Sequence, residues 1–450
     1  MARPTPLSGF PELLPSQRAA ELAVLDSLRT TFELHGFASI ETRSVEALDQ
    51  LLRKGETSKE VYVLRRLQAD SGDSDTGWGL HFDLTVPLAR YVLEHAGKLE
   101  FPLRRYQIQK CWRGERPQEG RYREFTQADI DVIGRDELAF DADVEVTEVM
   151  AAALSRLPLP PVTLHINNRK LIEGFYLGVG AEDPATVIRA VDKLDKIGAD
   201  GVCGLLLDSA GLDAAQVDQC LALAGISSTD ASFADKVLAL GVRHPLLDQG
   251  MDELVRALDG ASHVRSERFT VVADLKVARG LDYYTGTVFE GRMVTHGDIS
   301  ICAGGRYDAL ASDGHTSFPG VGISLGVTRV LAPLMARGLI DADRSVPSCV
   351  LVALPTENDR DSARAIARAL RSRGIATEVA PSAARFGRQI RHADRRGIPY
   401  VWFPATGDGG DQVKDIRSGE QVDADASVWQ PPVDDLRPRL VSTDLQELLP

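Results

Sequence analysis

Cysteine is scarce in this sequence, and long apolar runs are missing. The five cysteines are Cys111, Cys203, Cys220, Cys302 and Cys349. An odd, scattered set without a CxxC spacing argues against a disulfide framework or a structural zinc site, so we expect a reducing, cytoplasmic setting. No apolar run approaches the roughly 18 residues that a membrane span needs, and the opening MARPTPLSGF lacks the apolar core of a secretion signal. We therefore expect neither export nor a membrane partner.

Basic residues are outnumbered by acidic ones. The chain has 51 lysines and arginines against 65 aspartates and glutamates, a formal net charge of −14. This balance excludes an indiscriminate nucleic-acid binder but allows a local basic face on an acidic body. The 450 residues, 44% of them hydrophobic, suffice for two or three globular domains with sizeable cores.

The order of hydrophobic patterns predicts an α+β domain over residues 1–335. A helix is expected after Pro15, with apolar residues at helical spacing and Gly36 at its end. From about 38 to 175, short strand-like runs alternate with charged turns, which indicates a mainly antiparallel sheet flanked by helices. Residues 178–258 are typical of a helical insertion, after which strand-like sequence returns.

The last third predicts a separate, small α/β domain over residues 348–430, with residues 336–347 as a linker and 431–450 as a poorly ordered tail. Strand-like and helical segments alternate there, which favours parallel strands. Ten arginines gather between residues 360 and 396 of this domain: Arg360, Arg364, Arg368, Arg371, Arg373, Arg385, Arg388, Arg391, Arg395 and Arg396. Helical surface charge would explain them, and so would a basic face for RNA.

The segment CWRGERPQEGRYREFTQADIDVIG (111–134) carries the strongest chemical signal. Its arginines alternate with glutamates around Pro117 and Gly120. A solvated charged hairpin is the plain explanation of this pattern. The functional explanation is a loop whose arginines bind phosphate oxygens beside an aromatic ring, Phe125.

The same segment resembles motif 2 of the class II aminoacyl-tRNA synthetases, in the form typical of the histidyl branch. The resemblance implies that Arg113 binds the α-phosphate of ATP, that Glu115 binds the adenine amino group, and that Phe125 stacks on adenine. The other implied loop contacts are Arg121 with the nucleotide's phosphates, and Arg116 and Gln118 with the end of the tRNA acceptor stem. By this resemblance, the sheet of residues 1–335 would be the class II catalytic domain.

A second segment, KVARGLDYYTGTVFEG (276–291), contains adjacent tyrosines, which most often pack in a core. Its ARGLDYYTG part resembles a signature of the histidyl branch, which implies that Arg279 meets the substrate carboxylate and the α-phosphate. Arg279 and Arg113 would then be the catalytic pair. Tyr284 would help to read the imidazole ring. CAGGRYDAL (302–310) is similar to the glycine-rich strand of the histidine pocket, with Tyr307 pointing inward.

The segment HFDLTVPLAR (81–90) is predicted to be a strand, on which Asp83 and Thr85 would face one side. A carboxylate and a hydroxyl suit an ammonium group, although a surface pair is the commoner explanation. The resemblance implies that Asp83, Thr85 and Gln127 bind the α-amino group of histidine, and that Asp131 accepts a hydrogen bond from its ring. The spacing of Gln127, Asp129 and Asp131 fits one face of a strand.

Two further segments resemble the remaining class II motifs. PGVGISLGVTRVL (319–331) is similar to motif 3, which implies that Arg329 packs on adenine and reaches the γ-phosphate. Thr328 stands where the histidyl pattern usually has glutamate. HGFASIETRSVE (35–46) resembles motif 1, the dimer-interface segment, with Arg43 in place of its typical proline.

The resemblance implies a ligase that activates histidine with ATP and Mg²⁺ and transfers it to tRNA(His). The implied protein is a homodimer, with a C-terminal anticodon-binding domain and without zinc or an organic prosthetic group. The main alternative is the synthetase-like regulatory subunit of ATP phosphoribosyltransferase. Such paralogues tend to lack both the RGLDYYTG segment and the C-terminal domain. A decayed scaffold that only binds RNA, or a class II synthetase for another amino acid, would fit the motifs less well.

Overall fold

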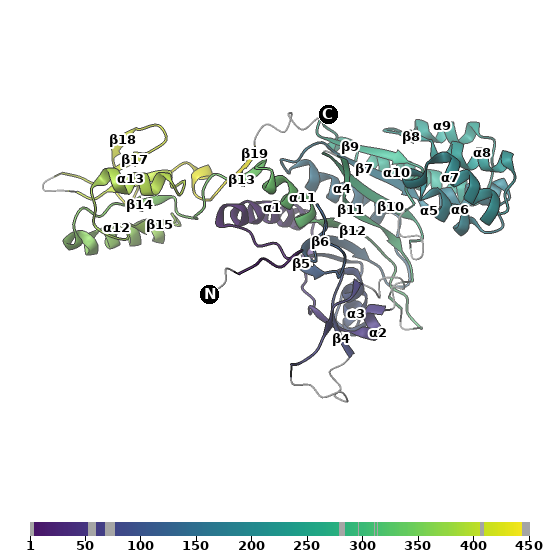
Figure 1. The fold of residues 1–450 in the computed structure, drawn as a ribbon, viewed down its shortest axis with the longest axis horizontal. Coiled ribbons are helices and arrows are strands. Elements are labelled where there is room, and N and C mark those ends of the chain that lie inside the picture. The colour runs from purple at the N-terminus through teal and green to yellow at the C-terminus, as the bar shows by residue number, and fades with distance from the viewer. Residues whose placement is uncertain are drawn as a thin grey trace. The chain divides into compact units, whose positions relative to one another are not determined.

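The computed structural model describes residues 4–52, 60–67, 77–278, 284–295, 297–309, 311–312, 314–405 and 409–442. They form two compact units, drawn in Figure 1. The larger unit is chiefly Ser27–Pro333 and is called the catalytic unit after the domain that the resemblance implies. The C-terminal unit contains the described residues from Leu334 onward together with Glu12–Asp26. In the described part of the chain, no helix is long and apolar enough to cross a membrane.

The first helix, α1 (Pro15–Leu34), confirms the helix expected after Pro15. Leu28 and Phe32 stand one turn apart and are fully buried. Gly36 adopts a left-handed φ of 79°, a conformation that glycine reaches without steric cost, so the helix ends there.

A nine-stranded sheet forms the body of the catalytic unit. In spatial order its strands are β1 (Ala38–Ser39), β5 (Leu103–Trp112), β6 (Glu124–Ile133), β12 (Gly320–Gly326), β11 (Gly297–Tyr307), β10 (Thr287–Thr295), β7 (Val162–Asn168), β9 (Phe269–Asp274) and β8 (Ser227–Ser228). Two neighbouring pairs, β1–β5 and β7–β9, are parallel, and the other pairs are antiparallel. The predicted antiparallel-dominated sheet with flanking helices is confirmed.

The long helix α4 (Asp141–Ser155) packs against β6, β9 and β12. Its residues Val146, Val149 and Met150 are fully buried, as helical spacing of apolar residues predicts. The helix α11 (Val327–Ala336) follows β12 directly. A small three-stranded sheet has the order β2 (Val45–Ala47), β4 (Trp78–Leu80), β3 (Val63–Leu64). The short helix α2 (Leu48–Leu51) follows β2 and contacts α3 (Thr85–His95).

Helices dominate the chain between β7 and β9. They are α5 (Arg169–Val179), α6 (Pro184–Val191), α7 (Leu194–Ser209), α8 (Ala214–Ala224), α9 (Ser232–Ala239), α10 (Pro245–Gly260) and the short η4 (Ser262–Val264). Figure 1 shows α5–α10 gathered at the β7–β9 side of the sheet. Asp183 and Asp213 cap α6 and α8 through their side chains, which is why these helices start where they do. A helical insertion was expected over 178–258, and the helices begin earlier, at Arg169.

The C-terminal unit has its own five-stranded sheet, in the order β15 (Thr377–Val379), β14 (Val350–Val352), β16 (Tyr400–Phe403), β17 (Gln412–Asp415) and β18 (Gln421–Asp423). The first three strands are parallel, and β17 and β18 form an antiparallel hairpin. Its helical elements are η5 (Glu357–Asp359), α12 (Arg360–Ser372), α13 (Phe386–Asp394) and η6 (Val433–Asp435). The predicted alternation of strand and helix is therefore present in this order.

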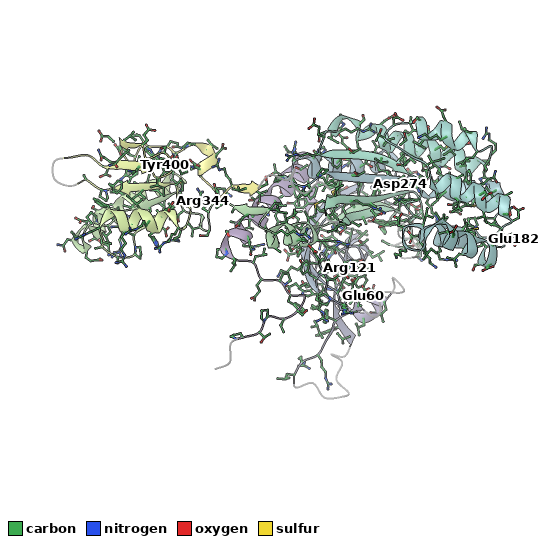
Figure 2. All side chains as sticks on the ribbon, turned by 45° about the horizontal axis from the view of Figure 1, so that its top comes forward. Glu60, Arg121, Glu182, Asp274, Arg344 and Tyr400 are labelled. Carbon is green, nitrogen blue, oxygen red and sulfur yellow. The ribbon has the colours of Figure 1, made fainter. Side chains whose placement is uncertain are left out.

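The predicted linker and the described part of the predicted tail, residues 431–442, contain regular structure, and residues 443–450 of the tail lie outside the described residues. Within the linker, β13 (Ile340–Ala342) pairs with β19 (Leu440–Ser442), a strand of the predicted tail. In the tail, Asp435 is buried and accepts a 2.7 Å hydrogen bond from the hydroxyl of Tyr400, a residue labelled in Figure 2. Local composition predicted a poorly ordered tail because it does not reveal the partners of these residues, which are distant in the sequence.

Candidate active site

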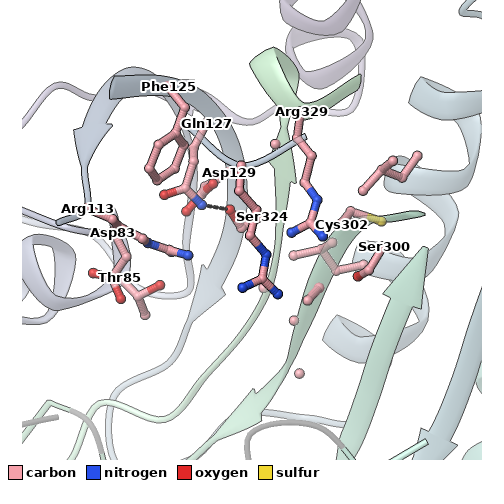
Figure 3. A pocket seen from close by; sticks show the side chains of 18 of the residues that line it. Asp83, Thr85, Arg113, Phe125, Gln127, Asp129, Ser300, Cys302, Ser324 and Arg329 are labelled. Carbon is pink, nitrogen blue, oxygen red and sulfur yellow. Dashed lines mark hydrogen bonds between the residues drawn. The ribbon is translucent and has the colours of Figure 1, made fainter. Parts of the chain in front are cut away.

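A cavity of about 330 Å³ lies over β6, β11 and β12 in the catalytic unit. Figure 3 shows part of its lining. The predicted site residues that line it are Asp83, Thr85, Arg113, Glu115, Arg121, Phe125, Gln127, Asp131, Tyr284, Tyr307 and Arg329. Segments almost 250 residues apart in sequence, from Asp83 to Arg329, thus meet at one place.

Two predicted site residues that the structure describes are not part of this lining, and a third is not described. Arg279 lies outside the described residues. Arg116 and Gln118 are exposed in the loop between β5 and β6. Backbone hydrogen bonds of 2.8 and 3.1 Å between Gln118 and Arg121 tighten that loop into a turn.

The strand expected around Asp83 and Thr85 is wrong, because Thr85 begins the helix α3. The Asp83 carboxylate accepts a 3.0 Å hydrogen bond from the backbone N–H of Val86, one of the donors that a helix start leaves unsatisfied. Pro87 is tolerated in this first turn. Both predicted residues still line the cavity, through the geometry of a helix start instead of a strand face.

Arg113 lies at the end of β5 and is held from two sides. Its Nε donates to the backbone oxygen of Phe82 at 3.0 Å, and its guanidinium carbon lies 5.1 Å from the centre of the Phe125 ring. Glu115 stands between two cations, with 3.9 Å to Arg113 Nη1 and 3.4 Å to Arg121 Nη1. An anionic ligand would compete with Glu115 for both guanidinium groups.

Glu60 is a neighbour of this loop that sequence reasoning did not single out. Its backbone oxygen accepts a 2.8 Å hydrogen bond from the N–H of Gly114. Burial, and then repulsion from Glu115, raises the pKa of the Glu60 carboxyl, which the charges of Arg113 and Arg121 oppose. Figure 2 labels Glu60 and Arg121, which both belong to the catalytic unit.

Asp131 is fixed from both of its carboxylate oxygens. The Tyr307 hydroxyl donates to Oδ1 at 2.8 Å, and Nη2 of the fully buried Arg105 lies 2.5 Å from Oδ2. Gly322 makes room for this arrangement, since a Cβ there would lie 2.1 Å from Asp131 Oδ1. The sequence did not identify Arg105 as a site residue, because a buried arginine on a strand has no distinctive spacing.

Asp129 stands between Gln127 and Asp131 on the cavity face of β6, and no role was assigned to it from the sequence. Its backbone pairs with Gln107 of β5 and with Ser324 of β12. Burial raises the pKa of the Asp129 carboxyl to about 7, an effect that Asp131 increases and Arg105 reduces. The sequence feature that could have identified Asp129 as a site residue is the alternation of Gln127, Asp129 and Asp131 along one strand. Figure 3 shows Gln127 donating to Ser324 beside it.

Thr328, which replaces the usual glutamate, joins α11 to β6. Its hydroxyl accepts a 2.8 Å hydrogen bond from the backbone N–H of Thr126. This bond holds the start of the helix that carries Arg329. A Cβ on Gly120 would lie 3.6 Å from Arg329 Cγ, so the charged loop closes over the stem of that arginine.

Comparison with known proteins gives one consistent family. The model described as "Histidyl-tRNA synthetase" matches residues 9–330, and that described as "Anticodon binding domain" matches residues 348–424. The histidine–tRNA ligase of Cutibacterium acnes is 58% identical over 98% of this chain and 100% of its own length. That of Micrococcus luteus is 54% identical over 98% of this chain and 99% of its own. The crystal structure of histidyl-tRNA synthetase from Nostoc sp. PCC 7120 superposes with a TM-score of 0.83 at 31% identity, covering 95% of this chain and 98% of that one.

The regulatory-subunit alternative is not favoured, because these relatives match along nearly the whole chain and a second model matches the C-terminal unit. The chain therefore belongs to the histidyl-tRNA synthetase family, the aminoacyl-tRNA synthetases that ligate histidine to tRNA.

Proposed function

We propose that this chain makes histidyl-adenylate from histidine and ATP, releases pyrophosphate, and passes the histidyl group to the 3′ end of tRNA(His). The observation that carries the proposal is the meeting, in one cavity, of a cationic loop with a set of buried carboxylate and amide groups. The first set suits a nucleotide's phosphates, and the second suits a cationic amino acid with a polar ring.

The nucleotide is bound by the charged loop and by α11. Arg113 and Arg279 stabilise the charge that develops on the α-phosphate while the histidine carboxylate attacks it. Glu115 binds the adenine amino group. Adenine stacks between Phe125 and Arg329, and Arg121 contacts the phosphates. ATP enters as its Mg²⁺ complex, so the ion is part of the substrate.

Catalysis of the first step requires no protein nucleophile. The substrate carboxylate itself is the nucleophile, and pyrophosphate is the leaving group. The enzyme contributes positioning and a preorganised positive charge. The 3.0 Å hydrogen bond from Arg113 Nε to the Phe82 carbonyl supports this role, because it fixes the guanidinium before any ligand arrives.

Histidine is bound over β6 and β11. Asp83, Thr85 and Gln127 receive the α-amino group, and Asp131 accepts a hydrogen bond from the ring. Tyr284 and Tyr307 complete the ring pocket, and the bond from Tyr307 to Asp131 orients the carboxylate. Such a pocket rejects analogues without ring nitrogens, since its buried polar groups would stay unpaired.

The tRNA is bound at two places on the chain. Arg116 and Gln118, both exposed, contact the end of the acceptor stem. Among the ten arginines that the sequence singles out in the C-terminal unit, the exposed ones are Arg364, Arg368, Arg371, Arg385, Arg388, Arg391 and Arg395. Other arginines there bond within the unit: Arg373 donates to the carbonyls of Ala426 and Trp429, and Arg396 pairs with Glu378 at 2.9 Å. The RNA face is therefore a subset of the arginines that the sequence offers.

The working form is a homodimer in the cytoplasm. The motif 1 resemblance supports the dimer, and Arg43, which replaces its proline, has Glu46 at 3.3 Å and Glu94 at 3.8 Å within the same chain. The cysteines support a reducing compartment, since all five are free thiols.

Exchange of labelled pyrophosphate into ATP tests the activation step. Exchange with histidine, and with none of the other amino acids, is expected in the absence of tRNA. A folded sample that binds histidine but supports no exchange would instead favour the regulatory-subunit function. Charging of tRNA(His) then tests the second step.

A further inference from the structure

Asp129 has an unused acceptor in the middle of the cavity lining. The residue is 2% exposed and lines the cavity with Gln127 and Asp131. Its Oδ1 atom is buried and accepts no hydrogen bond within the described part of the chain. A buried carboxylate oxygen without a donor costs free energy, so its retention on a cavity wall indicates a donor on the ligand.

The neighbouring carboxylates are already engaged by the protein. Asp131 receives Tyr307 on one oxygen and Arg105 on the other, and Arg105 offsets its charge. Asp83 Oδ1 accepts the N–H of Val86 at the start of α3. Asp129 therefore offers, among the described residues, a buried acceptor that these protein donors do not occupy.

The chemistry of the substrates selects the donor. The triphosphate of ATP is a polyanion and would be repelled by a carboxylate at this place, whereas the α-ammonium group of histidine is a cation with three N–H donors. We propose that Asp129 is a histidine-binding residue whose carboxylate pairs with the α-ammonium group of the substrate. The proposal rests on the proposed function, and it adds a charge partner to Asp83, Thr85 and Gln127.

A pH dependence follows from the groups that face Asp129. These are Asp131 on the same strand, Arg105 and the Cys111 thiol on β5, and Asp83 at the start of α3. Because the pKa of the Asp129 carboxyl in the free enzyme is about 7, part of it is protonated near neutral pH. The ammonium group favours the ionised form, so binding lowers this pKa and releases a proton. Affinity for histidine therefore falls as the pH drops below about 7.

The experiment measures, by calorimetry on the full chain, the affinities of wild type and Asp129→Asn for three ligands. Histidinol keeps the ammonium group and lacks the carboxylate, and imidazole-propionate lacks the ammonium group. We expect histidine and histidinol to bind Asp129→Asn about 30-fold more weakly, and imidazole-propionate to lose less than about threefold. The charge-matched control is Asp361→Asn on α12, where the side chain is 97% exposed and no affinity should change.

Equal losses for all three ligands would overturn the proposal, since Asp129 would then act on the ring or on the pocket's shape. Unchanged histidine affinity would also overturn it.

A second measurement needs no variant: wild type should release more protons on binding histidine than on binding imidazole-propionate at pH 7, and equal release contradicts the pairing. Wild-type pyrophosphate exchange separates the two proposals. Its absence removes the proposed function, whereas its presence with an unaffected Asp129→Asn removes the role of Asp129 alone.

Discussion

Two buried aspartates, one in each unit, have opposite surroundings. In the C-terminal unit, Asp435 accepts the Tyr400 hydroxyl at 2.7 Å and lies 2.7 Å from Arg417 Nη2. Hydrogen bonding by Arg417 lowers the pKa of the Asp435 carboxyl to about 2. In the catalytic unit, burial raises the pKa of the Asp129 carboxyl to about 7, and one of its oxygens accepts no hydrogen bond from any residue that the structure describes.

The difference distinguishes a carboxylate that stabilises a fold from one that waits for a ligand. Asp435 is satisfied by its own chain, so its ionised form contributes to folding free energy. Asp129 is kept in an unfavourable state that a cation can relieve, as expected for a residue at a functional site. Burial alone does not separate these roles, since both residues are nearly inaccessible. The number of hydrogen-bond donors around each carboxylate distinguishes the two roles.

Removal of a ligand-facing charge should have the largest effect. In Arg113→Ala, the rate of pyrophosphate exchange should fall by about two to three orders of magnitude, because a preorganised stabiliser of the α-phosphate charge is lost. Arg364→Ala on α12, with a side chain 57% exposed, is the matched control and should leave exchange unchanged. Near-normal exchange in Arg113→Ala would remove the residue from the catalytic assignment.

The second-largest effect is expected when a new side chain crowds the Asp131 carboxylate. In Gly322→Ala, the new Cβ would lie 2.1 Å from Asp131 Oδ1, so the carboxylate must move away from Tyr307 and Arg105. We expect the KM for histidine to rise about tenfold or more, with little change in the KM for ATP. Steady-state exchange kinetics measure both constants. An equal rise in both would mean that the whole cavity, and not the histidine side, is disturbed.

Neutralisation of Asp435 should alter stability and not catalysis. Because its pKa in the folded state, about 2, lies below the ordinary pKa of an aspartate, its ionised form stabilises the fold above about pH 4, and that contribution is lost as the pH falls toward 2. Asp435→Asn should therefore unfold about 2 kcal/mol more easily at pH 7, and the difference should shrink at acid pH. Urea denaturation followed by tryptophan fluorescence reports on this unit through Trp402 and Trp429, and on the catalytic unit through Trp78 and Trp112. A pH-independent difference would contradict the ionic origin.

The smallest effect is expected at a glycine where an added Cβ would contact nothing. Gly387 lies in α13, and a Cβ there would meet nothing within 4 Å. Gly387→Ala should leave histidine kinetics unchanged and stabilise the helix by up to about 0.5 kcal/mol, since alanine loses less backbone entropy than glycine. Thermal denaturation measures the gain. A loss of stability would show that the position is more constrained than its open surroundings indicate.

The limits of prediction follow from the range of the interactions involved. HFDLTVPLAR reads as a strand by alternation, yet the apolar pair Leu88 and Val92 is buried at helical spacing and the helix is formed. The strands β13 and β19 were missed because each is three residues long and gains its hydrogen bonds from a segment about 100 residues away. Short elements of this kind carry little local signal.

By itself the sequence determined the class of the catalytic sheet, the α/β order of the C-terminal unit and the family, because these depend on local periodicity and on contiguous motifs. Only the tertiary structure decided the pairing of Arg105 with Asp131, the role of Thr328 beside Thr126, and the Asp129 oxygen that no described residue pairs with. The physical reason is that a buried polar atom is satisfied or left unsatisfied by residues that the fold brings together from different strands. Spacing along one strand identified the face on which Asp129 lies, and only the neighbouring strands show which of its acceptors stays open.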